Sequence, residues 1–157
     1  MRTATIHQLV VFHAPPEDVY EALMNSAAHA QFTGEPASIS ATVGGEFNAH
    51  NQHVSGTNLE LDPGRKIVQR WRVVTWPSGH WSTVHFTFEP SDRGTLLRFM
   101  HQDIPSDNAK EIDIGWEERY WKPLKKYLKT PKAAAKPAKT KPKTKKPAAK
   151  PKAKKKR

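Results

Sequence analysis

The stretch DIGWEERYWKPLKKYL, residues 113–128, decides the fold of this chain. Large apolar side chains recur through it at spacings of four, four, four and three, which predicts one buried face of an amphipathic helix. The face consists of Ile112, Trp116, Tyr120, Leu124 and Tyr127, with Trp121 and Leu128 flanking it. Pro123 should bend this helix at a cost of about 3 kcal/mol, which aromatic burial can offset. We therefore expect a bent aromatic helix in the hollow of a curved sheet.

The segments before this helix predict that sheet. Residues 3–12 are rich in β-branched and apolar residues, as is typical of a strand, and two short helices are expected between Pro15 and Gly34. Short turns rich in Gly, Pro, Asn and Asp separate six further strand-like segments, so neighbouring strands should pair antiparallel. These segments are 37–43, 46–50, 53–61, 66–74, 81–89 and 95–102. The chain thus predicts an α+β fold with one curved antiparallel sheet.

Charge divides the chain into two parts. Residues 129–157 hold 14 of the 26 basic residues and none of the 15 acidic ones, although the whole chain has a net charge of +11. Residues 1–128 are therefore net negative, by 3, and contain every aromatic residue. We predict a globular domain over 1–128 and a Lys/Pro/Ala-rich tail over 129–157, which cannot form a core and should be disordered.

The tail predicts sequence-independent contact with nucleic acid or another polyanion, through counterion release. Its composition resembles linker-histone-type basic tails. The residues expected to contact phosphate are Lys139, Lys141, Lys143, Lys145, Lys146, Lys154, Lys155, Lys156 and Arg157. A solubilising tail without a specific partner, or a targeting signal, stays open as an alternative.

Composition also bounds the chemistry. The chain has no cysteine, which excludes disulfides and thiolate sites. No apolar stretch approaches the roughly 18 residues of a membrane span, and the N-terminus is a poor match to a signal peptide. We expect a cytoplasmic protein, associated with the nucleoid or, in a eukaryote, the nucleus through its tail. Neither a metal nor a cofactor is expected, because the histidines lack ligand spacing.

Strand parity predicts a cavity between the sheet and the helix. Its walls should be apolar with a few polar groups, as in small-molecule sites. The predicted lining is Phe47, Trp71, Phe86, Phe99, His101, Trp116 and Tyr120. The alternative is that these rings simply fill the core. His101 is the one candidate for an acid or base, although a hydrogen-bonded core histidine is the favoured interpretation.

Several stretches in this order and spacing resemble the activator of heat-shock protein 90 ATPase homologues, within the START-like (SRPBCC) helix-grip superfamily. They are HAPPEDVYEAL (13–23), VGGEF (43–47), SGTNLELDPGRKIVQRWR (55–72), WP (76–77), GTLLRF (94–99), DIP (103–105) and GWEERYWKPLKKYL (115–128). The resemblance covers nearly all of residues 1–128. It implies a sheet wrapped around the C-terminal helix, with a cavity between them, and a link to the stress response.

The resemblance leaves three functions open. Superfamily members bind lipids, hormones or polyketides, so the leading hypothesis is a non-enzymatic domain that binds an apolar small molecule or a protein partner. The second is a co-chaperone-like ATPase activator. Eukaryotic activators carry a similar domain behind an N-terminal chaperone-binding domain, which this sequence does not display. The third is a cyclase or hydrolase that uses the pocket, with His101 as the base.

Overall fold

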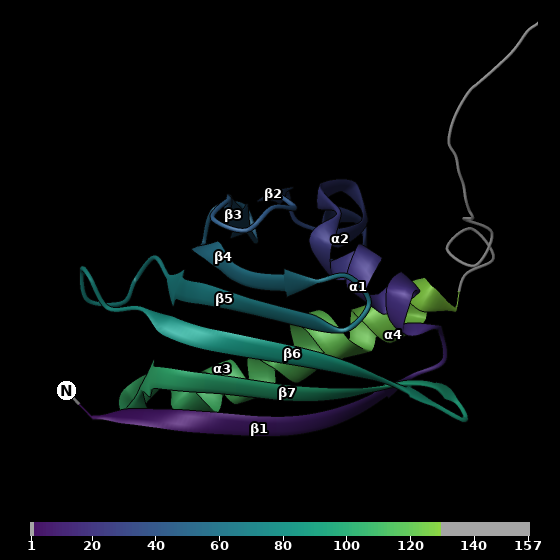
Figure 1. The fold of residues 1–157 in the computed structure, drawn as a ribbon. Coiled ribbons are helices and arrows are strands. Elements are labelled where there is room, and N and C mark those ends of the chain that lie inside the picture. The colour runs from purple at the N-terminus through teal and green to yellow at the C-terminus, as the bar shows by residue number, and fades with distance from the viewer. Residues whose placement is uncertain (1, 130–157) are drawn as a thin grey trace, which may run out of the picture.

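The computed structural model describes residues 2–129, which form one seven-stranded antiparallel sheet with helices on one face (Figure 1). The strands pair in the order β1-β7-β6-β5-β4-β3-β2. Their bounds are β1 Thr3–Phe12, β2 Ser38–Ile39, β3 Glu46–Ala49, β4 Val54–Asp62, β5 Lys66–Val73, β6 Ser82–Ser91 and β7 Gly94–Pro105. The N-terminal strand closes one edge by pairing with the last strand, and consecutive strands pair from β2 to β7.

The helices gather on the concave side of the sheet. Two short ones, α1 (Pro16–Met24) and α2 (Ser26–Thr33), follow β1 and pack against the end of the chain's last helix. That last helix is one continuous rod with four parts: a short 3-10 turn η1 (Ser106–Asn108), α3 (Ala109–Gly115), a π-helical segment η2 (Trp116–Trp121) and α4 (Lys122–Leu128). Figure 1 shows the rod running behind β6 and β7, with its α4 end beside α1.

Side-chain parity explains why the sheet has one wet face and one covered face. On β6, Val84, Phe86 and Phe88 are buried beneath the helix, whereas the intervening residues are half-buried on the other side. Leu97 and His101 on β7 are completely buried on the same covered face. The predicted α+β architecture, with a curved antiparallel sheet around a C-terminal helix and two short helices after the first strand, is confirmed.

The C-terminal helix departs from the predicted α-helical spacing at its centre. The Lys122 backbone N–H donates to the carbonyl of Glu117, five residues back, as in a π-helical turn. Five-residue spacing therefore returns to the same face, and Trp121 stacks on Trp116 with ring centroids 5.5 Å apart. Trp121, which we predicted to flank the apolar face, is completely buried at its centre.

The same π-helical turn accommodates the proline. Pro123 has no N–H and lies in the first turn of α4, immediately after the widened turn, where the regular hydrogen-bond ladder is already interrupted. Ile112 and Tyr127, the two ends of the predicted apolar face, are only half-buried.

The predicted strand 37–43 is wrong beyond its first residues, because only Ser38–Ile39 pair as β2. The buried Asn58 side chain causes the change. Its amide donates to the backbone carbonyls of Ser40 and Thr42, at 2.6 and 3.0 Å, so the chain curls around it instead of extending.

The predicted domain boundary lies at the edge of the described residues. Helix α4 ends at Leu128, and residues 130–157, with all nine predicted nucleic-acid contacts, lie outside what the structure describes. Within residues 2–129 no helix is both long and apolar enough to cross a membrane.

Candidate functional site

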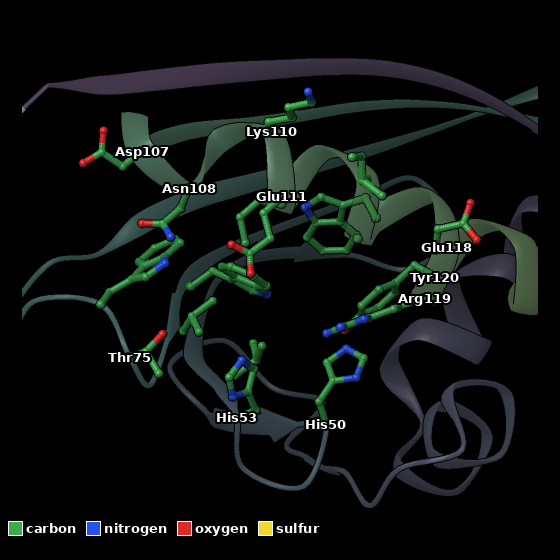
Figure 2. Close-up of a pocket in the computed structure, with 18 residues that line it drawn as sticks. His50, His53, Thr75, Asp107, Asn108, Lys110, Glu111, Glu118, Arg119 and Tyr120 are labelled. Carbon is green, nitrogen blue, oxygen red and sulfur yellow. The ribbon is translucent and has the colours of Figure 1, made fainter.

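A cleft of about 810 Å³ opens between the C-terminal helix and the adjoining ends of β4 and β5 (Figure 2). Its volume lies within the range of roughly 300–1,000 Å³ that small-molecule sites occupy. One wall comes from η1, α3 and η2, and the other from β4, β5 and the loops beside them. The lining residues are His50, His53, Val54, Trp71, Val73, Thr75, Trp76, Asp107, Asn108, Lys110, Glu111, Ile112, Ile114, Gly115, Trp116, Glu118, Arg119 and Tyr120.

Three tryptophans form the apolar floor of this cleft. Trp71 comes from β5, Trp76 from the loop after it and Trp116 from η2, and all three are buried. The Trp71 ring lies 5.7 Å from Trp76 and 5.6 Å from Trp116, measured between ring centroids. The Trp71 and Trp76 rings meet edge to face, and the Trp71 and Trp116 rings are tilted by 35°.

One end of the cleft is polar. His50 and His53 flank the loop between β3 and β4, and Arg119 and Tyr120 face them from η2 (Figure 2). The His50 and Tyr120 rings meet edge to face, 5.2 Å apart. Burial, followed by the nearby charge of Arg119 and by His53, lowers the pKa of His50 to about 4. His50 is therefore a neutral imidazole at neutral pH.

A second histidine supports Tyr120 from behind. The Tyr120 hydroxyl and His29 Nε2 on α2 are hydrogen-bonded at 3.1 Å, and the other ring nitrogen of His29 is buried without a hydrogen-bond partner among the described residues. Burial, then the neighbouring His50, lowers the pKa of His29 to about 4, and burial raises the pKa of Tyr120. Both groups stay uncharged at neutral pH and fix the position of the Tyr120 ring.

His101 lies below the cleft floor, in the middle of a series of hydrogen bonds that joins the C-terminal helix to β5. The Trp116 indole N–H donates to His101 Nδ1 at 3.0 Å, so the ring proton lies on Nε2, which donates to Ser82 Oγ at 2.8 Å. The Ser82 hydroxyl in turn donates to the Trp71 carbonyl at 2.7 Å. Burial lowers the pKa of His101 to about 3. With both nitrogens engaged, His101 has the contacts expected of a core histidine.

The seven predicted cavity residues divide between the cleft and the core. Trp71, Trp116 and Tyr120 line the cleft, whereas Phe47 and Phe86 join those three around a much smaller void of about 20 Å³. Phe99 and His101 line neither space. Phe99 packs 4.5 Å from Trp116 and 5.2 Å from Phe86, as ring centroids, and so belongs to the packed core.

Sequence reasoning missed the polar end of the cleft and Trp76. Nothing in the sequence places the turn that carries His50 and His53 opposite Arg119. In the structure, His50, Asn51 and Gln52 all adopt left-handed conformations, with φ of 52°, 56° and 71°. Left-handed conformations are uncommon at non-glycine residues, so the surrounding chain constrains this turn.

The described residues offer no metal centre. Among residues 2–129 no group of three or more His, Cys, Asp or Glu side chains is arranged to hold a metal ion. The groups that line the cleft include aromatic rings, two imidazoles, and the charged side chains of Asp107, Lys110, Glu111, Glu118 and Arg119.

The sheet, the enclosed C-terminal helix and the cleft between them together define a START-like helix-grip protein. The chain belongs to the family described as Activator of Hsp90 ATPase homolog 1-like protein, whose model matches residues 13–129. The predicted family is confirmed.

Relatives of known name support this assignment. The chain is 32% identical over 114 residues to the human activator of 90 kDa heat shock protein ATPase homolog 1, covering 73% of this chain and 34% of that protein. A Plasmodium falciparum HSP90 activator has the same fold, with a TM-score of 0.73 at 22% identity over 79% of this chain and 95% of that one. A Chromobacterium violaceum protein matches with a TM-score of 0.68 at 26% identity, over 80% and 97% of the two chains. The chain spans about a third of the length of the curated relatives it matches.

The buried histidines predict a loss of stability in mild acid. The unfolded chain binds protons to His29, His50 and His101 below a pH of about 6.5, but the folded protein does not until their lowered pKa values of about 4, 4 and 3 are reached. The free energy of unfolding should therefore be constant above that pH and fall as the pH drops from about 6.5 to 4. Urea unfolding across this range measures it.

Replacing His101 measures how much of this pH dependence of the free energy of unfolding comes from that one side chain. His101→Gln should reduce the slope between pH 6.5 and 5 by about 1.4 kcal/mol per pH unit, the value for one proton. His13→Gln, on the exposed surface, is the matched control. Identical slopes for His101→Gln and the unchanged protein would contradict the buried neutral state of His101.

Proposed function

We propose that this protein is a non-enzymatic START-like binding domain that takes an apolar small molecule in the cleft between its helix and sheet. The cleft of about 810 Å³ with a tryptophan floor carries this proposal. Its size fits a drug-sized molecule, and Trp71, Trp76 and Trp116 supply apolar contact. Binding is favoured over catalysis because His101, the sequence candidate for a base, lies outside the cleft lining with both nitrogens engaged.

We further propose that the tail over 129–157 tethers this domain to nucleic acid. The support is the charge of the sequence: 14 basic residues and no acidic one. Such a segment binds phosphate through counterion release and does not read sequence. It would also hold the domain at the nucleoid or in the nucleus.

A second candidate function is co-chaperone activity, which the names of the relatives favour. The human relative is an activator of the 90 kDa heat shock protein ATPase, and this chain matches about a third of it. If this domain activates the chaperone, saturating protein should raise the turnover of a 90 kDa heat-shock ATPase. Unchanged turnover would reject this function.

Filling the cleft tests the binding proposal. Gly115 lies on the helix wall, and a side chain built there meets nothing within 4 Å. The phenylalanine ring of Gly115→Phe should therefore occupy the cleft without disturbing the core. This variant should bind the neutral fluorescent probe N-phenylnaphthylamine at least about 10-fold more weakly, equivalent to 1.4 kcal/mol. Fluorescence titration measures it.

The alanine variant is the matched control. Gly115→Ala adds only one methyl group, so it should bind the probe like the unchanged protein and should raise thermal stability by up to about 1 kcal/mol, as for Gly to Ala in a helix. Equal probe affinity in the phenylalanine and alanine variants, or no binding by the unchanged protein, would contradict a ligand site in the cleft.

Removal of the tail tests the tethering proposal. Deleting residues 129–157 should abolish retention on DNA and leave the melting temperature nearly unchanged. For the full chain, the logarithm of the DNA association constant should fall with the logarithm of salt concentration at a slope of about −6, if half the charges contact phosphate. Equal DNA binding by the truncated chain would overturn the proposal.

A further inference from the structure

Charge is distributed unevenly along the cleft. From η1 and α3 come Asp107, Lys110 and Glu111, and Figure 2 shows Glu111 projecting over the middle of the cleft. From η2 come Glu118 and Arg119. Glu118 is engaged outside, because its carboxylate accepts a hydrogen bond from Lys122 at 2.6 Å.

Arg119 supplies the charge at the polar end of the cleft, because the neighbouring Glu118 is paired with Lys122. It forms none of the ion pairs made by the described residues. Figure 2 shows its guanidinium and the His50 ring directed toward one another beside Tyr120. The Arg119 guanidinium thus faces a neutral imidazole, and no carboxylate among residues 2–129 forms an ion pair with it.

The opposite side of this end is held in place. The His50–Gln52 turn keeps three consecutive residues in left-handed conformations, which non-glycine residues rarely adopt. Backbone bonds fix it: the Asn51 N–H donates to the Pro36 carbonyl at 3.0 Å, and the His53 N–H donates to the His50 carbonyl at 3.1 Å. The two imidazoles are thus presented to the cleft by a turn that the surrounding chain constrains.

We infer that the ligand of this cleft has a flat apolar ring system and one anionic group, and that the anionic group lies between Arg119 and His50. The inference rests on the proposed binding function. The rings would lie on Trp71 and Trp116, and the anion would receive charge-assisted hydrogen bonds from the guanidinium, with the imidazoles of the constrained turn as further donors. The Glu111 carboxylate repels an anion from the middle of the cleft, so the group is confined to the Arg119 end.

Two probes that differ by one anionic group test this inference on the full chain. Anilinonaphthalenesulfonate and N-phenylnaphthylamine share their ring system, but only the first carries a sulfonate. The unchanged protein should bind the sulfonate more tightly than the neutral probe. Arg119→Gln should weaken sulfonate binding about 10-fold and leave the neutral probe unaffected, because it removes only the contact with the anion.

Matched variants separate this contact from general charge. Lys126→Gln removes one exposed positive charge near the end of α4, outside the cleft lining, and should change neither affinity. Glu111→Gln should strengthen sulfonate binding about 2-fold, by removing repulsion. Thermal melts verify that each variant is folded.

The outcomes separate a wrong ligand class from a wrong binding function. If the neutral probe binds but Arg119→Gln leaves the preference for the sulfonate unchanged, or weakens both probes equally, the anionic ligand class is wrong and the binding function stands. If Lys126→Gln weakens sulfonate binding as much as Arg119→Gln, general charge explains the preference and the inference is overturned. If neither probe binds the full chain, the proposed function fails and takes this inference with it.

Discussion

The position of the Trp116 indole is the constraint on which the rest of the structure depends. Its N–H donates to His101 on β7, its ring packs 4.5 Å from Phe99, and it stacks 5.5 Å from Trp121 on the next turn, between ring centroids. The same ring forms part of the cleft floor. One side chain therefore joins the helix to the sheet and forms part of the candidate ligand site.

The polar contacts beneath that ring specify how the helix lies on the sheet. A buried donor or acceptor without a partner costs about 1–3 kcal/mol, so Trp116, His101 and Ser82 are stabilised only in the register that satisfies all of them. Apolar packing alone would tolerate a shifted helix. The hydrogen-bond chain selects one position and thereby sets the width of the cleft between Gly115 and β5.

Local patterns in the sequence predicted most of the fold but only part of the site. Strand parity correctly placed Phe86 on the face of the sheet that the helix covers, because the two-residue period of a strand is a local property. The π-helical turn was not predictable from α-helical spacing, so Trp121 was assigned to the flank. The polar end of the cleft depends on residues 50 and 119 lying at the same end of the cleft, which no local pattern encodes. Strand parity also could not separate the cleft from the packed core, so the predicted cavity included Phe99 and His101, which lie in the core.

Hydrogen exchange of the five tryptophan indole N–H groups, followed by NMR, tests the central claim most directly. If Trp116 links helix to sheet, its indole proton should exchange only on global unfolding, as should that of Trp121, which donates to Gln8. The Trp81 ring, half-buried with Arg70 4.4 Å above it, should exchange much faster. Exchange of Trp116 as fast as that of Trp81 would contradict the account of both the fold and the cleft.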